Sequence, residues 1–141
     1  MDSITTDTLV YIDTNVWIYY LEANPDFVQK VRDVFVRVEA VGAKLFTNEI
    51  TIAECLYKPS RDGNSRAVAA YEQLFCSGEV TLTPLDGGLA KRAAVSGGQL
   101  GLKLVDAIHY IAALEQGCDV FVTSDRQFKS GPAMQVMTIL R

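Results

Sequence analysis

The chain has 141 residues, 49% of them hydrophobic and 21% charged, so one globular domain spanning residues 1–141 is expected and disordered, fibrous and low-complexity proteins are excluded. Thirteen Lys and Arg residues oppose seventeen Asp and Glu residues. The resulting net charge of −4 argues against a protein that coats nucleic acid by bulk electrostatic attraction.

Apolar runs bounded by polar or glycine residues predict five strands. The first run, Leu9-Val10-Tyr11-Ile12, is continuous, which is typical of a strand buried on both faces of a parallel sheet. The predicted strands span 9–12, 44–47, 80–83, 119–123 and 135–139.

Helical spacing of apolar residues predicts six helices between and after these strands. Asn24 and Pro25 are interpreted as the N-cap and first residue of the second helix, and Gly42 as its end. Pro59 is expected to stop the third helix, and the Gly97-Gly98 pair the fifth. The predicted helices span 16–22, 25–41, 49–58, 66–75, 86–96 and 102–115.

Strands and helices alternate along the whole chain, which predicts an α/β three-layer sandwich with a central, mainly parallel five-stranded sheet and right-handed crossovers. Ligands bind such sheets at the carboxyl ends of the strands. The longest apolar run, 16–21, is far shorter than the roughly 20 residues of a membrane-spanning helix, and the polar N-terminus does not resemble a signal peptide. Three cysteines without a CxxC spacing suggest reduced thiols, so we expect a cytoplasmic protein that makes no contact with a membrane.

The chain has a single histidine, His109, which excludes chemistry that needs two imidazoles. Ribonucleases that pair a histidine acid with a histidine base are therefore ruled out, as are zinc sites of the His₂ or His₃ type within one chain. His109 itself is more often a packed residue than a catalyst. If the protein is an enzyme, carboxylates or a metal must carry out the chemistry.

Four acidic residues are candidates for that chemistry. Asp13 and Asp125 follow the first and fourth predicted strands, at the edge where α/β sheets bind ligands, although each could simply cap a helix. Asp106 lies in the first turns of an otherwise apolar helix, where a buried carboxylate needs a partner or a metal unless the helix N-terminus alone favours it. Glu54 lies between apolar neighbours and could equally face solvent.

Polar neighbours and basic residues complete the candidate list. Asn15 could cap the first helix or orient Asp13, and Thr123 could donate a hydrogen bond in the same region, although lone hydroxyls at strand ends usually belong to turns. A solvated surface is the default interpretation for the basic residues. The candidate RNA contacts are Lys58, Arg61, Lys103 and Arg126.

Four segments together resemble the motifs of the PIN domain family, in the family's order and across nearly the whole chain. The chain is most similar to the VapC-type toxins of toxin–antitoxin pairs. The matching segments are 11–15, 50–54, 101–109 and 122–128.

The resemblance implies a strand order of 3-2-1-4-5 and an endoribonuclease that depends on Mg²⁺ or Mn²⁺, usually a homodimer inhibited by a cognate antitoxin. The polar residues that support the family's acidic site correspond to Asn15 and Thr123. Its acidic quartet corresponds to Asp13, Glu54, Asp106 and Asp125.

This chemistry suits the residues. Four converging carboxylates would repel one another and raise one another's pKa values, and a hard divalent cation would relieve that repulsion. Asp13 and Asp106 are expected to hold the principal metal, and Glu54 and Asp125 to position water or a second metal. Without these four, the remaining acidic residues would equal the basic ones in number.

Two other classes of function remain open. An aspartyl phosphotransferase would use Asp13 as its nucleophile, but that family expects a second aspartate where this chain has Asn15. A non-catalytic α/β scaffold would use the acidic pocket only to bind a cation or a partner.

Overall fold

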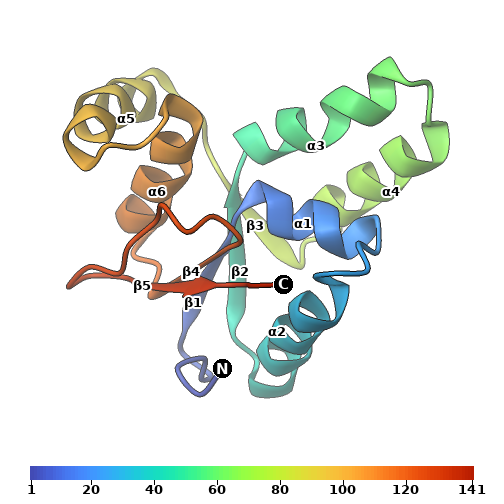
Figure 1. Ribbon diagram of the computed structural model, residues 1–141, viewed down its shortest axis with the longest axis horizontal. Coiled ribbons are helices and arrows are strands. Elements are labelled where there is room, and N and C mark those ends of the chain that lie inside the picture. Colours follow the sequence, from blue (N-terminus) through green and yellow to red (C-terminus); the bar gives the residue numbers. More distant parts are fainter.

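The computed structural model describes residues 1–141 and contains one five-stranded parallel sheet in the order β3-β2-β1-β4-β5 (Figure 1). Both the sheet and its strand order confirm the prediction, and each strand lies within one residue of its predicted bounds. The strands are β1 (Leu9–Ile12), β2 (Lys44–Asn48), β3 (Val80–Thr83), β4 (Val120–Thr123) and β5 (Gln135–Thr138).

Alternating side chains divide the core into two clusters, one on each face of the sheet. From β1, Val10 and Ile12 point into the first cluster, whereas Tyr11 points into the second. All three are completely buried, because β1 is the central strand and is covered on both faces. The hydroxyl-bearing ring of Tyr11 is therefore directed towards the helices of the second cluster.

Helices cover both faces of the sheet (Figure 1). Four pack on the first cluster and two on the second. The first four are α1 (Thr14–Leu21), α2 (Val28–Val41), α3 (Ile50–Arg61) and α4 (Ser65–Cys76), and the other two are α5 (Gly87–Leu100) and α6 (Leu104–Gln116). None of these helices is both long and apolar enough to span a membrane.

The start of α2 differs from the prediction. The helix begins at Val28, and Phe27 occupies the N-cap position without a capping side chain. Asn24 instead forms a local turn, in which its Oδ1 accepts a hydrogen bond from the Asp26 N–H at 2.9 Å. This competition between a local turn and a helix cap is common for asparagine. The predicted end at Gly42 is confirmed, with φ at 72°.

Two predicted helix ends are wrong. Helix α3 passes through Pro59 to Arg61, although Pro59 has no N–H to donate to the carbonyl four residues earlier. Helix α5 passes through Gly97 and Gly98 and ends at Gly101, which has a φ of 70°. Gly97 serves close packing instead of termination, because a Cβ there would lie 2.7 Å from the Cβ of Ala107 on α6.

Candidate active site at the carboxyl edge of the sheet

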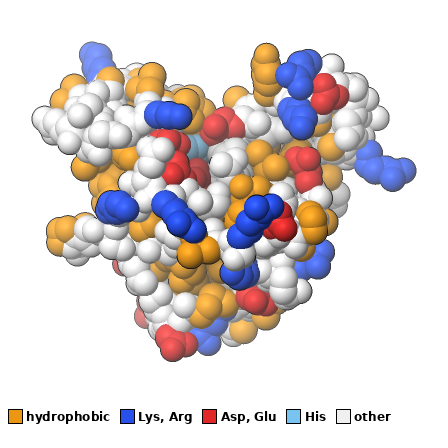
Figure 2. All heavy atoms as spheres, viewed as in Figure 1, with side chains coloured by type: hydrophobic (Ala, Val, Ile, Leu, Met, Phe, Trp, Pro, Cys, Tyr) orange, Lys and Arg blue, Asp and Glu red, His pale blue; other side chains and the backbone are white.

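The carboxyl ends of the central strands open into a notch between the α5–α6 pair and the α3–α4 pair. Acidic side chains surround the single histidine at the floor of this notch (Figure 2). Asp13 follows β1, Asp125 follows β4, Glu54 comes from α3 and Asp106 from the first turn of α6. The elements on both sides of the notch therefore contribute candidate residues.

Asp13 is held from two sides and is only 5% exposed. Its Oδ1 accepts a hydrogen bond from the Thr14 N–H at 2.9 Å, and its Oδ2 accepts one from the Thr123 hydroxyl at 2.8 Å. The first bond makes Asp13 the N-cap of α1, so the capping interpretation is correct for this residue. The second joins the ends of β1 and β4, and both oxygens are consequently fixed.

Glu54 is an exposed residue, but one of its carboxylate oxygens is bound within the site. Its Oε1 accepts a hydrogen bond from the Thr14 hydroxyl at 2.7 Å and lies 2.7 Å from Nε2 of His109. Nε2 also lies 3.0 Å from Oγ1 of Thr14 and 3.7 Å from Oδ1 of Asp13. Thr14 and His109 therefore connect Glu54 to Asp13 without a direct contact between the two carboxylates.

Asp106 and Asp125 are less constrained. Asp125 forms a turn in which its Oδ1 accepts a hydrogen bond from the Gln127 N–H at 2.8 Å, and its own N–H donates to Oγ1 of Thr123 at 3.0 Å. Asp106 is half-buried, and neither of its oxygens has a protein hydrogen-bond partner. These two carboxylates retain oxygens free to bind a ligand.

Burial and neighbouring charges shift the pKa values of three of the four acids. Partial burial raises the pKa of Asp106, and repulsion by Asp13, Asp125 and Glu54 adds to the effect. Burial also raises the pKa of Asp13, an effect that His109 and Thr123 only partly offset. Burial acts in the same sense on Glu54, but the hydrogen bonds from His109 and Thr14 outweigh it and lower that pKa.

Asn15 performs neither of its two expected roles. It is exposed on the second residue of α1, the capping role belongs to Asp13, and Asn15 makes no hydrogen bond with that carboxylate. Thr123, in contrast, is completely buried and donates to Asp13.

Sequence reasoning missed Thr14, Tyr11 and the contacts of His109. The Tyr11 hydroxyl lies 2.7 Å from Nδ1 of His109 and accepts a hydrogen bond from the Asn48 N–H at 3.0 Å. His109 is only 1% exposed. The available signal was its position three residues after Asp106, on nearly the same face of one helix.

The candidate RNA contacts belong to three different parts of the chain. Lys58 and Arg61 lie in the last turn of α3, where Arg61 pairs with Asp62 at 3.1 Å. Lys103 is the N-cap residue of α6, and Arg126 borders an open hollow beside β5. All four side chains belong to exposed residues.

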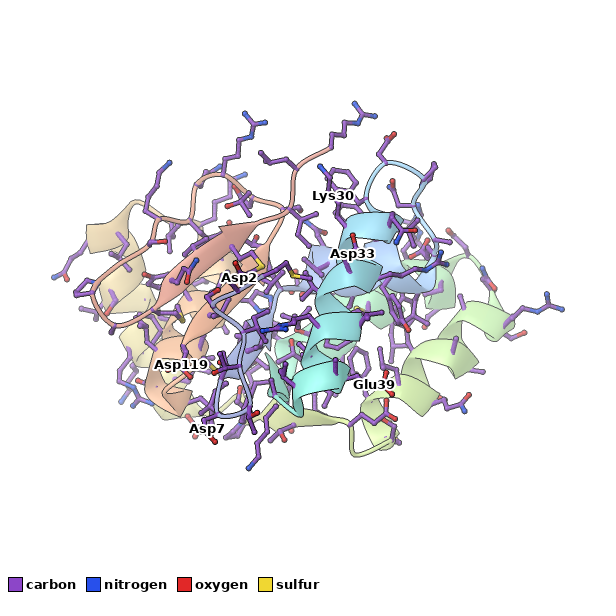
Figure 3. The ribbon with its side chains drawn as sticks, turned by 90° about the horizontal axis from the view of Figure 1, so that it is seen from below. Asp2, Asp7, Lys30, Asp33, Glu39 and Asp119 are labelled. Atoms are coloured by element: carbon purple, nitrogen blue, oxygen red, sulfur yellow. The ribbon has the colours of Figure 1, made fainter.

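Acidic residues also lie at the opposite edge of the sheet. Asp2, Asp7 and Asp119 gather around the segment that leads into β1 (Figure 3). There Oδ2 of Asp119 accepts a hydrogen bond from the Leu9 N–H at 2.9 Å. The excess of acidic residues is therefore distributed over both edges, and the charge balance alone does not locate a site.

The carboxylates suit a hard divalent cation in their chemistry. Mg²⁺ and Mn²⁺ sites are built from oxygen ligands, and their carboxylates repel one another when no cation is bound. Asp106 is repelled in this way by its acidic neighbours. No three Asp, Glu, His or Cys side chains are close enough in this conformation to surround one ion. This does not conflict with Mg²⁺, which is usually bound through one or two protein carboxylates and keeps several waters.

Residues 10–132 match the sequence profile of the PIN domain family. Solved structures with a similar fold include VapBC2 from Rickettsia felis bound to a DNA fragment from its promoter, with a TM-score of 0.72 and 16% identity over 94% of this chain and 99% of that chain. A toxin–antitoxin complex from Klebsiella pneumoniae has a TM-score of 0.67 and 17% identity, over 92% and 96% of the two chains. VapC20 from Mycobacterium tuberculosis, a toxin that cleaves the sarcin–ricin loop, has a TM-score of 0.64 and 18% identity, over 79% and 86%. No curated protein matches the sequence significantly.

Proposed function

The chain belongs to the PIN domain family, and we propose that it is a divalent-metal-dependent endoribonuclease, the toxin of a VapBC-type toxin–antitoxin pair. The similar solved structures include toxin–antitoxin complexes and a toxin that cleaves the sarcin–ricin loop. A structured RNA is therefore the substrate class to test first, and a cognate antitoxin the partner. We further propose that the protein acts in the cytoplasm as a homodimer.

One observation carries this proposal: the carboxylates of Asp13 and Glu54 lie 3.7 Å and 2.7 Å from the same nitrogen, Nε2 of His109, at the carboxyl edge of the sheet. Partial burial raises the pKa of the neighbouring Asp106, and the charges of Asp13, Asp125 and Glu54 raise it further. Residues far apart in the sequence thus bring their carboxylates within electrostatic range at the edge where parallel sheets bind ligands. A protein gains nothing in stability from such repulsion, and perturbed carboxylates of this kind concentrate at functional sites.

Each residue has a proposed role. Asp13 and Asp106 would hold Mg²⁺ or Mn²⁺, and Glu54 and Asp125 would position water or a second ion. A bound divalent cation supplies an activated water at neutral pH and offsets charge on the scissile phosphate. The hydrogen bonds from Thr14 and Thr123 hold Asp13 in one orientation and partly offset the effect of its burial, which raises its pKa.

The remaining charged residues would bind the RNA backbone. The exposed residues Lys58, Arg61, Lys103 and Arg126 would contact phosphates on either side of the cleaved bond. Because the site itself is acidic, these contacts must compensate for the repulsion between the RNA and the carboxylates.

The geometry disfavours an aspartyl phosphotransferase. That family expects a second aspartate two residues after its nucleophile, and this position holds Asn15, which is exposed and makes no hydrogen bond with Asp13. A non-catalytic scaffold would bind a cation without cleaving RNA, and the experiment below distinguishes it from a nuclease.

The test is incubation of the purified protein with total cellular RNA in Mg²⁺ or Mn²⁺, followed by mapping of the new ends. We expect cleavage at few sites, leaving 5′-phosphate and 3′-hydroxyl ends, and its loss in Asp106→Asn. Asp33→Asn is the matched control, because Asp33 lies on α2 at the opposite edge (Figure 3). Products with 2′,3′-cyclic phosphates, or equal cleavage by both variants, would refute the proposal.

A further inference from the structure

A chain of hydrogen bonds runs from the backbone of β2 to the candidate site through two buried side chains. The Asn48 N–H donates to the Tyr11 hydroxyl at 3.0 Å, and that hydroxyl lies 2.7 Å from Nδ1 of His109. On the other side of the ring, Nε2 lies 2.7 Å from Oε1 of Glu54. Tyr11 and His109 are at most 1% exposed, so no solvent substitutes for these contacts.

The donors in this chain define the tautomer of the imidazole. The Tyr11 oxygen already accepts a hydrogen bond from Asn48, so its own proton is available to Nδ1 of His109. A neutral imidazole that accepts at Nδ1 carries its proton on Nε2. Nε2 then donates to Oε1 of Glu54, with Oγ1 of Thr14 close by at 3.0 Å.

The effect on Glu54 is asymmetric. Oε1 receives hydrogen bonds from both His109 and the Thr14 hydroxyl, whereas Oε2 makes no hydrogen bond within the protein. The carboxylate is thus anchored by one oxygen, and the other is left without a protein partner. A glutamate on a helix has several rotatable bonds, and without this anchor it would sample many rotamers.

We propose that Tyr11 and His109 are positioning residues that hold Glu54 by Oε1 so that Oε2 serves the site, an inference that rests on the proposed nuclease function. Neither residue touches the substrate. Their role is that of the outer partners that orient ligating side chains in metal sites, whose loss typically lowers metal affinity or activity about 10- to 100-fold.

The first test is spectroscopic and does not depend on activity. Because the chain has one histidine, nitrogen-15 spectra of the folded protein, recorded at a pH where the ring is neutral, report the tautomer of His109 alone. We expect a proton on Nε2 and none on Nδ1, and a shift of that balance in Tyr11→Phe. A neutral ring that carries its proton on Nδ1 in the wild type would overturn the inference.

The second test compares variants in their Mn²⁺ affinity, measured by titration calorimetry, and in their rate of RNA cleavage. His109→Leu removes the donor to Glu54 and should lower the Mn²⁺ affinity, the cleavage rate or both about 10- to 100-fold. His109→Gln retains an amide N–H of similar reach and should restore most of the loss. Rescue by Gln separates a positioning role from simple packing.

Tyr11→Phe keeps the ring that stacks on Phe121 and removes only the hydroxyl. Its matched control is Tyr71→Phe, since Tyr71 is equally buried but donates its hydroxyl to Glu22 at 2.8 Å, away from the site. Both variants should lose thermal stability, but only Tyr11→Phe should lose Mn²⁺ affinity or cleavage rate. Equal function in both variants would overturn the inference.

The two proposals fail in different ways. If the wild type neither binds a divalent cation nor cleaves RNA, the nuclease function is wrong, whatever the tautomer of His109. If the wild type does both, but His109→Leu and Tyr11→Phe match it, the positioning role alone is wrong.

Discussion

Replacement of Gly97 by alanine should destabilise the protein, whereas the same change at Gly98 should stabilise it. Both glycines lie inside α5. A Cβ at Gly97 would lie 2.7 Å from the Cβ of Ala107, whereas ordinary contacts are 3.4–4 Å, so α5 and α6 would have to separate locally. Nothing lies within 4 Å of a Cβ at Gly98.

The magnitudes follow from two opposing effects. Overpacking costs about 1–3 kcal/mol, and replacing glycine with alanine in a helix returns up to about 1 kcal/mol. The Cβ of Ala107 is fixed to the backbone and cannot swing away from a 2.7 Å contact, so the cost lies in the upper part of that range, about 2–3 kcal/mol. The net loss for Gly97→Ala is therefore about 1–2 kcal/mol, or roughly 3–6 °C in Tm for a domain of this size. Gly98→Ala brings only the gain in helix propensity, so its Tm should rise by roughly 2–3 °C.

Thermal unfolding monitored by circular dichroism measures both shifts. The double variant Gly97→Ala with Ala107→Gly removes the clash and should be more stable than the sum of the single effects by about 1 kcal/mol. Shifts of the same sign in Gly97→Ala and Gly98→Ala, or additive effects in the double variant, would refute the close approach of α5 and α6. Because Ala107 adjoins Asp106, Gly97→Ala should also lower cleavage.

Three further predictions concern the charges of the site. The folded-state pKa of Asp106 is raised, so the stability linked to its proton is present at pH values below about 4 and is lost as the pH rises through the folded pKa. Asp106→Asn should therefore be more stable than the wild type at pH 7 without metal. A urea titration that finds the variant less stable would contradict this. With Mg²⁺ at about 10 mM and a Kd of about 1 mM, the wild type should gain about 1.4 kcal/mol, roughly 3–6 °C in Tm, and Asp106→Asn should gain almost nothing. Neutralising Arg126 should weaken RNA binding across sequences and reduce the salt slope by about 1, while an unchanged slope in filter binding would remove it from the RNA contacts.

Most of the fold could be predicted from the sequence because its strands are short, apolar and clearly bounded. Asp13 and Asp125 follow directly from that pattern, since the residue after a buried parallel strand lies at the ligand-binding edge. Helix ends were harder, and Gly97 illustrates why. A glycine that ends a helix and one that permits close helix packing look the same in the sequence.

The interior of the candidate site could not be predicted. The contact between Tyr11 and His109 joins residues 98 positions apart, and the sequence around neither residue predicts it. In the sequence, Tyr11 looks like any other apolar residue of a buried strand, and Thr14 looks like an ordinary residue at the start of a helix. Pairing between particular polar atoms depends on the register of β1 against β2 and on the rotation of α6, which only the assembled structure defines.

The central position of β1 has a consequence for synthesis of the protein. Its two neighbours are β2 and β4, and β4 begins more than 100 residues after β1 on the ribosome. The nascent chain can therefore pair β1 on one side only until β4 emerges, and such distant parallel pairings form slowly. Asp125 comes after β4, so the four carboxylates cannot meet before nearly all of the matched family region has been translated. A chain interrupted earlier would therefore lack the complete site.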